Sequence, residues 1–205
     1  MASEVYLIRH GQTIGNLTGA RLHNPGLTDL GRAQAAALAA ALRAERPAPI
    51  LSSPLLRALE TASAIAAATG APLLVWNDLV EMNGWQPYSS SPRDELRRLF
   101  PRAELEPDMP EAGWSYPGPE DAAAGWARAA RVVRRVSALP GERVAVVAHG
   151  TFNAMLLCTW LRARVDGAVG FAQDNGAMSR LTVAAGRTVL HTCNDVAHLP
   201  PEVRS

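Results

Sequence analysis

Apolar and polar positions along the chain predict strands and helices in alternation. The short apolar run at residues 4–9 predicts a buried strand, and the periodic run at 29–46 predicts a helix. The run RVAVVAH at 143–149 is almost continuously apolar, which is typical of a strand in the middle of a sheet covered on both faces. Further strands are expected at 49–53, 73–75, 179–184 and 187–192, and further helices at 54–70, 92–100, 119–139 and about 151–162.

Residues that favour helix and hairpin ends support these boundaries. Thr28 is a good N-cap for the first long helix, and Pro54 suits the first position of the next helix, which Gly70 can end. Ser91 is expected to cap the short helix that follows it. The dipeptide at 185–186 between the last two strands predicts a β-hairpin, so the chain should end in an antiparallel pair.

The alternation of strands with helices predicts an α/β fold. We expect a three-layer sandwich in which helices flank a mostly parallel, mixed sheet, with the terminal hairpin supplying the antiparallel strands. The whole chain, 1–205, is expected to form a single domain. The proline- and charge-rich segment at about 84–119 is interpreted as a cap-like insertion folded over the sheet edge. Its aromatic residues, whose expected use is packing, are Trp85, Tyr88, Trp114 and Tyr116.

Composition and charge narrow the classes of function. With 48% hydrophobic and 19% charged residues, the chain has the composition of an ordinary soluble globular protein. A formal net charge of +1 gives no long-range field that would gather nucleic acid or an anionic membrane, and we expect neither as a partner. No apolar segment approaches the ~18 residues that cross a bilayer.

Cysteine usage and the first residues indicate a cellular compartment. Cys158 and Cys193 form no CxxC motif, and the start of the chain, MASEVYLIRH, lacks the pattern of a secretion signal. The reducing cytoplasm is therefore the expected location. The sequence leaves open whether the chain forms a homo-oligomer.

All 20 residues counted as lysine or arginine are arginine. The absence of lysine excludes a Schiff-base lysine, a pyridoxal-phosphate lysine and a Walker-type phosphate loop. Any phosphate site must therefore use arginine, whose planar guanidinium binds two phosphate oxygens at once. An arginine stripe on the helix at 119–139 is expected to be a solvated helix face, although it could bind anions. The stripe consists of Arg128, Arg131, Arg134 and Arg135.

Two histidines follow strands at the edge where an α/β sheet binds ligands. His10 follows the first strand and His149 the central one, and glycine comes after each. A neutral imidazole is a good nucleophile toward phosphorus, and Arg9 places a guanidinium beside the first of them. Arg57 lies in the first helical turn after SSP, where a phosphate would also meet helix amides. Taken alone, that arginine would be read as a surface partner of Glu60.

A carboxyl group and two further histidines complete the set of polar candidates. Glu81 lies in LVEMNGW just past a strand, where it could protonate a departing alkoxide and then deprotonate water. His191 is expected to lie along a late strand and His198 to pack, so neither is a candidate for the site.

Together these motifs resemble those of the histidine phosphatase superfamily, also called the phosphoglycerate mutase-like family. The resemblance rests on LIRHGQT with its RHG motif, LTDLGRAQA, SSPLLRALETA, LVEMNGW and VAVVAHGTFNAML, in that order. It extends from about residue 4 to 199 and leaves out only the insertion. Many members have an aspartate where Asn24 stands, and WEG where Trp85 is followed by Gln86, so no particular substrate is implied.

The resemblance implies a reaction and a set of site residues. His10 would be the nucleophile that accepts the phosphoryl group, and Glu81 the proton donor. Attack on a phosphomonoester would give a phosphohistidine that water then hydrolyses, without a metal ion or another cofactor. Thr28 and Gly31 match family positions that are structural. The phosphate pocket would consist of Arg9, Arg57, His149 and Asn16.

The sequence leaves open which loop residues contact the substrate and which phosphoryl-transfer reaction takes place. Arg21 and His23 are candidate substrate contacts, although a solvated position is the stronger expectation for His23. The absence of lysine and the short insertion favour hydrolysis of a small phosphorylated metabolite over phosphoglycerate mutase-type transfer, which would also need a bisphosphate primer. A weakly catalytic module that binds phosphorylated ligands is a further alternative, although the expected catalytic residues are all present.

Overall fold

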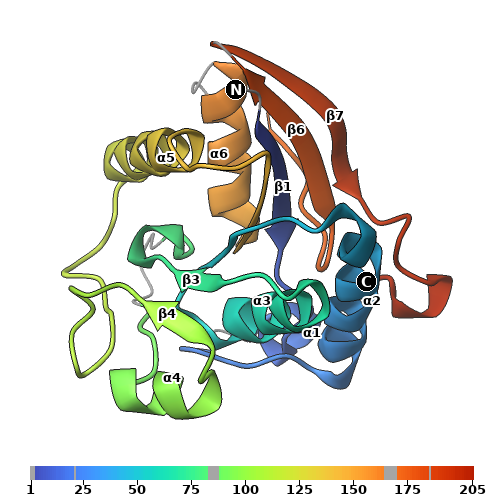
Figure 1. Cartoon of the computed structure of the whole chain (residues 1–205). Coiled ribbons are helices and arrows are strands. Elements are labelled where there is room, and N and C mark those ends of the chain that lie inside the picture. The colour runs from blue at the N-terminus through green and yellow to red at the C-terminus, as the bar shows by residue number, and fades with distance from the viewer. Residues whose placement is uncertain (1–2, 21, 83–87, 164–169, 185) are drawn as a thin grey trace.

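The computed structural model describes residues 3–20, 22–82, 88–163, 170–184 and 186–205. Within these residues, seven strands form one sheet in the order β4-β3-β2-β5-β1-β6-β7 (Figure 1). The strands are β1 (Ser3–Arg9), β2 (Ile50–Ser52), β3 (Leu73–Val75), β4 (Ala103–Leu105), β5 (Arg143–Ala148), β6 (Met178–Ala184) and β7 (Arg187–Asp195). The helices are α1 (Ile14–Thr18), α2 (Asp29–Glu45), α3 (Leu56–Thr69), α4 (Arg93–Leu99), α5 (Ala122–Ser137) and α6 (Gly150–Leu161), with 3-10 turns η1 (Asn77–Leu79) and η2 (Pro201–Val203).

The directions of the strands confirm the predicted mixed sheet. The five strands from β4 to β1 in the sheet order are parallel, whereas β6 runs antiparallel to β1 and β7 antiparallel to β6. In the central pair, Arg9 of β1 lies opposite Ala148 of β5. Because parallel neighbours end at the same edge of a sheet, the residues after these two strands emerge side by side.

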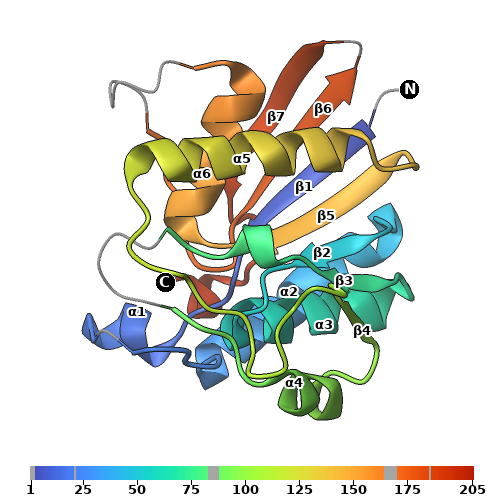
Figure 2. The same cartoon turned by 90° about the vertical axis from the view of Figure 1, so that its left-hand side faces the viewer.

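Helices cover both faces of the sheet, which confirms the predicted three-layer α/β sandwich. Figure 2 shows α5 and α6 on one face and α2 and α3 on the other. Since successive strand residues point to opposite faces, β1 contributes to two apolar cores. Val5 and Leu7 pack with residues of α5 and α6, whereas Tyr6 and Ile8 pack with residues of α2 and α3.

The start of α2 agrees with the sequence prediction, whereas the start of α3 does not. The Thr28 hydroxyl accepts a bond from the Gly31 amide at 3.0 Å, so the predicted cap of α2 is confirmed. The prediction of Pro54 as the first helical residue is wrong, since α3 begins at Leu56. The chain first makes a tight turn in which the Leu55 amide donates to the Ser53 hydroxyl at 3.3 Å.

The ends of two later helices also differ from the prediction. Pro92, and not Ser91, precedes α4, because the Arg93 amide donates to the distant Glu111 carbonyl at 3.0 Å. The helix expected from residue 119 begins at Ala122, where the Asp121 carboxylate caps it. The short elements α1 and β4 have no counterpart in the prediction, because five and three residues are too few to show a period.

The expectation of a solvated arginine face on α5 is wrong for Arg128. Its side chain is 5% exposed and lies 2.7 Å from the carboxylate of Glu120, which is 7% exposed. Arg131 and Arg135 do pair with Asp78 nearer the surface. Arg128 is buried because the chain at 78–82 and at 116–120 folds over this part of α5.

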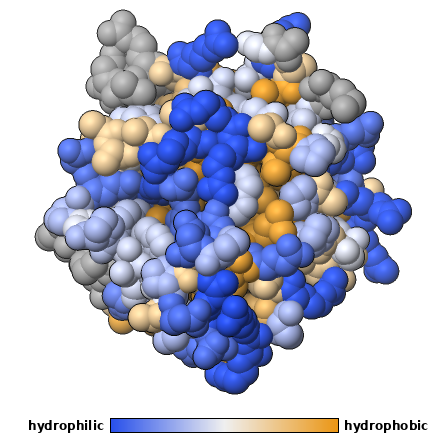
Figure 3. All heavy atoms as spheres, turned by 60° about the vertical axis from the view of Figure 1, so that its left-hand side comes forward, coloured by the Kyte–Doolittle hydropathy of each residue, from blue (hydrophilic) through white to orange (hydrophobic). Residues whose placement is uncertain are grey.

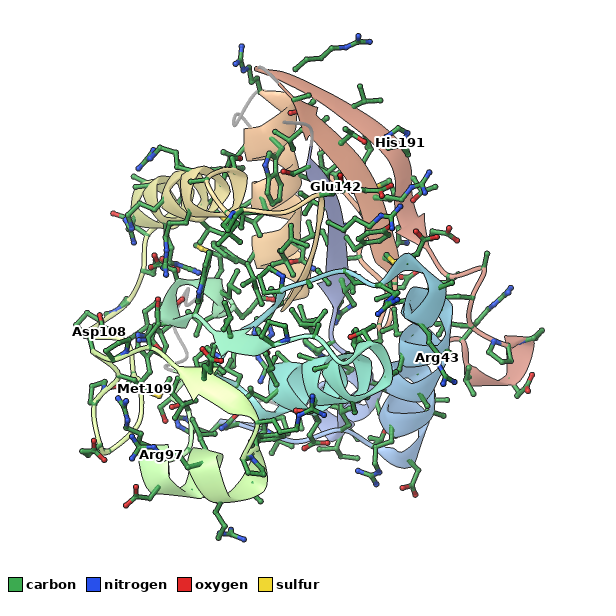
Figure 4. All side chains as sticks on the ribbon, viewed as in Figure 1. Arg43, Arg97, Asp108, Met109, Glu142 and His191 are labelled. Carbon is green, nitrogen blue, oxygen red and sulfur yellow. The ribbon has the colours of Figure 1, made fainter. Side chains whose placement is uncertain are left out.

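The segment at 88–119 supplies the edge strand β4, which pairs with β3, and other residues of the segment pack against α3 and β3. Leu96 of α4 and Met109 share an apolar cluster with Leu59 and Val75, against which Trp114 is partly buried. Figure 4 labels Met109 and its neighbour Asp108 in the loop that follows β4. Trp85 lies outside the described residues. Trp114 thus has the packing use expected from the sequence.

Exposed apolar side chains are few among the described residues. Figure 3 shows one face that is largely hydrophilic, with hydrophobic residues in separate patches. The large apolar side chains at the surface are Ile14, Leu17, Leu22, Leu99 and Val189. Within the described ranges, no helix is both long and apolar enough to cross a membrane.

Candidate active site

The two strand-end histidines meet at the carboxyl edge of the sheet. His10 follows β1 and His149 follows β5, and their ring centroids are 5.1 Å apart with an interplanar angle of 61°. Both side chains are buried, His10 being 3% exposed and His149 fully enclosed. The parallel pairing of β1 with β5 is what brings together two residues that are far apart in the sequence.

The hydrogen bonds of His10 define which ring nitrogen can react. Its Nδ1 lies 2.7 Å from the Gly11 carbonyl, which can only accept, so Nδ1 carries the proton. Its Nε2 accepts a bond from Nε of Arg57 at 3.2 Å and therefore presents a lone pair. Burial lowers the pKa of His10 well below its usual value, and the positive charges of Arg57 and Arg9 lower it further. His10 is thus a neutral imidazole with Nε2 as its nucleophilic atom.

A second imidazole lies beside the first and is also held neutral. The pKa of His149 is well below its usual value because of burial, with Arg57 and His10 as the next causes. Its Nε2 is 2.8 Å from the hydroxyl of Ser53, a residue whose partnership with His149 the sequence did not suggest. Its Nδ1 is buried without a hydrogen-bond partner among the described residues.

The guanidinium of Arg9 is only partly hydrogen-bonded within the described part of the chain. One terminal nitrogen donates to the Gln173 carbonyl at 2.5 Å, while the buried Nε has no hydrogen-bond partner in the described part of the chain. A buried donor without a partner is unfavourable unless a ligand completes it. Arg9 therefore has a donor available for an anion.

The carboxylate of Glu81, a residue of the chain after η1, lies at the first turn of α6, the helix that begins directly after His149. Its Oε1 accepts from the Met82 and Phe152 amides at 2.8 and 2.9 Å, and its Oε2 accepts from the Thr151 amide at 3.2 Å. The first-turn amides of a helix lack partners inside the helix and favour an anion. The carboxyl group is thereby held at the wall of the same cavity as His10.

Four of these residues, Arg9, His10, Arg57 and Glu81, line a cavity of about 180 Å³, whereas the fully buried His149 is not among its lining residues. A phosphoryl group and a few further atoms fill such a space, so the rest of a larger ligand would extend outside. Leu22 and Pro25 form apolar parts of its wall. The polar lining residues are Arg9, His10, Thr13, Asn16, Arg57, Glu81 and Tyr88.

Asn16 is oriented by the bonds of its carbonyl oxygen. This Oδ1 accepts from the amide and hydroxyl of Thr13 at 3.0 and 2.9 Å, and from Nδ2 of Asn175 at 3.2 Å. The amide nitrogen of Asn16 is then the group left to donate to a ligand in the cavity. The expected neutral donor is therefore placed at the cavity wall.

Of the two candidate substrate contacts, only His23 lies among the described residues. His23 is exposed and does not line the cavity, because its Nε2 is hydrogen-bonded to the hydroxyl of Ser89. That bond joins the loop before α2 to the segment after Tyr88. Arg21 lies outside the described residues.

Two residues in the turn before β6, which the sequence reasoning missed, hydrogen-bond to the backbone of the nucleophile. Asn175 donates from Nδ2 to the His10 carbonyl at 3.1 Å, and the Gly176 amide lies 3.2 Å from the same carbonyl. The signal was the polar run QDN just before a strand, but its meaning depends on β6 pairing with β1.

The glycine of the RHG motif allows a close approach between two backbones. A Cβ at Gly11 would lie 2.4 Å from the carbonyl oxygen of Gly31, and a Cβ at Gly31 would lie 2.1 Å from that of Gln12. The Gly11 amide donates to the Thr61 hydroxyl at 3.1 Å. The loop after β1 is thus locked between the starts of α2 and α3.

Other hollows and histidines do not share this chemistry. A larger hollow of about 530 Å³ lies between α2, α3 and residues 99–103, but its lining is mostly alanine and leucine. Figure 4 shows His191 on the outer strand β7, where it bonds to Thr182 at 2.8 Å. His198 bonds to the Gly176 carbonyl at 3.0 Å. Among the described residues, no three His, Cys, Asp or Glu side chains are grouped as metal ligands.

Comparison with known proteins identifies relatives of the whole chain. A family model described as Histidine phosphatase superfamily (branch 1) matches residues 5–196. The glucosyl-3-phosphoglycerate phosphatase of Mycolicibacterium vanbaalenii is 33% identical over 173 residues, which cover 78% of this chain and 75% of that protein.

Solved structures share the fold over nearly the whole chain. The native structure of mycobacterial glucosyl-3-phosphoglycerate phosphatase matches with a TM-score of 0.66 at 26% identity, covering 95% of this chain and 99% of that one. The alpha-ribazole phosphatase from Shigella flexneri matches with a TM-score of 0.72 at 22% identity, covering 94% and 96%. At that identity, the second match shows the fold alone.

Proposed function

The chain belongs to the histidine phosphatase superfamily, and on that premise we propose that it is a phosphomonoester hydrolase that acts through a phosphohistidine on a small phosphorylated metabolite. One observation carries the proposal. His10, whose unprotonated Nε2 accepts from Arg57, lines a cavity together with two guanidinium groups and a carboxyl group, and a bound phosphate would draw the Arg57 donor away from Nε2. This combination suits transfer of a phosphoryl group to nitrogen.

In the first proposed step, Nε2 of His10 attacks phosphorus in line with the leaving oxygen. The N–P bond forms as the P–O bond to the alcohol breaks, and Glu81 donates a proton to the departing oxygen. In the second step, Glu81 takes a proton from water, whose oxygen attacks phosphorus and breaks the N–P bond. Inorganic phosphate and the starting imidazole result, so protons and charge balance over the cycle.

Three residues at the cavity, together with His149 buried beside His10, would stabilise charge on the phosphoryl oxygens. Arg9 and Arg57 are preorganised donors in a buried site, where such electrostatic stabilisation is strong. Asn16 would add a neutral donor, and His149 an imidazole that the site keeps neutral. Because the two arginines supply the positive charge, we infer that hydrolysis needs neither a metal ion nor another cofactor.

We propose a substrate class on the basis of the relatives. A glucosyl-3-phosphoglycerate phosphatase is similar to most of this chain, so phosphomonoesters of sugar-acid conjugates are the first compounds to test. We further propose that the chain acts as one domain in the cytoplasm without nucleic acid or membrane partners. Both cysteines are free thiols, which suits a reducing compartment.

The test is hydrolysis of para-nitrophenyl phosphate in the presence of a chelator. We expect turnover in the wild type, loss in His10→Gln, and wild-type turnover in His191→Gln as the matched histidine control. Enzyme quenched in alkaline denaturant should carry a phosphoryl group that is stable to base and lost in acid, as a phosphoramidate is. Turnover that survives in His10→Gln, or that the chelator abolishes, would contradict the proposal.

The mutase alternative is separated by product analysis. A mutase would convert one phosphoglycerate isomer to another only after addition of a bisphosphate primer, whereas a hydrolase releases inorganic phosphate without it. Tight binding of phosphorylated compounds without release of phosphate would instead indicate a binding module.

A further inference from the structure

The backbone that carries Glu81 is held in place by side chains outside the cavity. One terminal nitrogen of Arg128 donates to the carbonyls of Asp78 and Val80, each at 2.8 Å. The hydroxyl of Tyr116 donates to the carbonyl of Glu81 itself at 2.6 Å. Three carbonyls within four residues are thus bound by two side chains, one from α5 and one from the segment that precedes it.

Arg128 is itself fixed by an ion pair with Glu120. Its Nε and its second terminal nitrogen each lie 2.7 Å from one carboxylate oxygen of Glu120, in a bidentate arrangement. The same terminal nitrogen donates to the Tyr116 hydroxyl at 3.0 Å. Since both charged side chains are buried and neutralise each other, Arg128 is not placed to bind substrate phosphate.

The same guanidinium also contacts the helix that binds the carboxylate. It stacks on the ring of Phe152 with its central carbon 3.9 Å from the ring centroid. The amide of Phe152 is one of the donors to Oε1 of Glu81. Arg128 therefore touches both the backbone of Glu81 and the helix turn that orients its carboxyl group.

We propose that Arg128, Tyr116 and Glu120 are positioning residues that fix the proton donor Glu81 relative to the leaving oxygen. The inference rests on the proposed function, in which Glu81 protonates the departing alkoxide. It also assigns a task to the end of the segment at 88–119, because Tyr116 connects that segment to the catalytic carboxyl group. A displacement of about 1 Å from productive geometry can cost on the order of a hundredfold in rate.

The test compares substrates whose leaving groups differ in their need for a proton. Para-nitrophenolate departs readily without protonation, whereas the alkoxide of an alkyl phosphate does not, so only the second reaction depends on a well-placed acid. Tyr116→Phe removes one hydroxyl and keeps the ring that stacks on Trp114. We expect kcat/KM for the alkyl phosphate, which reports the steps up to departure of the leaving group, to fall at least tenfold, and kcat/KM for para-nitrophenyl phosphate to fall far less.

A matched control removes a buried tyrosine hydroxyl elsewhere. Tyr6 is 1% exposed, and its hydroxyl donates to Glu45 at 2.9 Å, on the face of the sheet that α2 covers. Tyr6→Phe should leave the ratio of the two kcat/KM values unchanged. Urea denaturation of both variants shows whether either loses stability, and a loss of stability alone cannot change the ratio.

Glu81→Gln separates failure of this inference from failure of the proposed function. If Glu81→Gln does not reduce the alkyl reaction selectively, the proton-donor role and the inference fall together. If it does, and Tyr116→Phe leaves the ratio of the wild type, only the positioning role is refuted. In the double variant we expect no further loss beyond Glu81→Gln, because a positioning residue has nothing left to position.

Discussion

The buried histidines predict how stability depends on pH. Folding lowers the pKa of both His10 and His149 well below the usual 6.5, because burial and the nearby arginine charges disfavour the imidazolium. As the pH falls through 6.5, the unfolded chain binds protons at these positions and the folded chain does not. The free energy of unfolding should therefore decrease as the pH falls below that value, and these groups should have no effect well above it.

The magnitude follows from the number of protons. Each histidine that is charged only in the unfolded chain adds a slope of about 1.4 kcal/mol per pH unit, so the pair adds about 2.8 kcal/mol per pH unit. Carboxyl groups add slopes of their own at lower pH. For this reason the useful quantity is the difference between the wild type and a variant that lacks one of the two imidazoles.

Urea denaturation at several pH values from about 7.5 to about 5.5 measures this difference. In His149→Asn, the fall in the free energy of unfolding from about pH 7.5 to about pH 5.5 should be smaller than in the wild type by about 1.4 kcal/mol in total, because the unfolded histidine is only about half protonated at pH 6.5. His191→Asn serves as the control, because His191 is exposed on β7, and it should keep the wild-type slope. Equal slopes in all three proteins would show that His149 is protonated in the folded chain, and the assignment of a neutral site would be refuted.

Three further substitutions test separate contacts. Arg57→Met should lower kcat/KM for para-nitrophenyl phosphate by about a hundred- to a thousandfold, and an unchanged value would exclude Arg57 from the phosphate site. Gly31→Ala should lower the free energy of unfolding by about 3 kcal/mol, because its Cβ would lie 2.1 Å from the Gln12 carbonyl oxygen; wild-type stability would contradict this. Ser53→Ala leaves Nε2 of His149 without its partner and should cost about 1–3 kcal/mol in urea denaturation, whereas no cost would show that the bond contributes nothing.

The site residues that could be predicted from the sequence are those that lie at or directly after the end of a strand. His10 and His149 each follow an apolar run, and parallel pairing of two such runs places both imidazoles at one edge. Arg9 and Arg57 adjoin this edge in the sequence as well as in space. Short-range patterns therefore suffice for residues whose place is fixed by the end of a strand or the start of a helix.

Residues positioned by long-range packing could not be predicted in this way. Arg128 occupies a periodic position on α5 that is indistinguishable in sequence from its solvated neighbours. It is buried only because residues 78–82 and Tyr116 reach it from distant parts of the chain. Asn175 supports His10 only because β6 pairs with β1. Helical and strand periods carry no information about such pairings.

The charges of the site suggest how one carboxyl group can act first as an acid. Positive charge resides on Arg9 and Arg57, since both imidazoles are kept neutral, and the carboxylate of Glu81 interacts electrostatically with both arginines. A phosphomonoester dianion bound to the same arginines would neutralise their positive charge in place of Glu81. It would also repel the neighbouring carboxylate. The proposed first step avoids this repulsion, because in it Glu81 carries the proton that it donates to the leaving oxygen. Transfer of that proton to the leaving oxygen restores the carboxylate, which is the form needed to accept a proton from water in the second step.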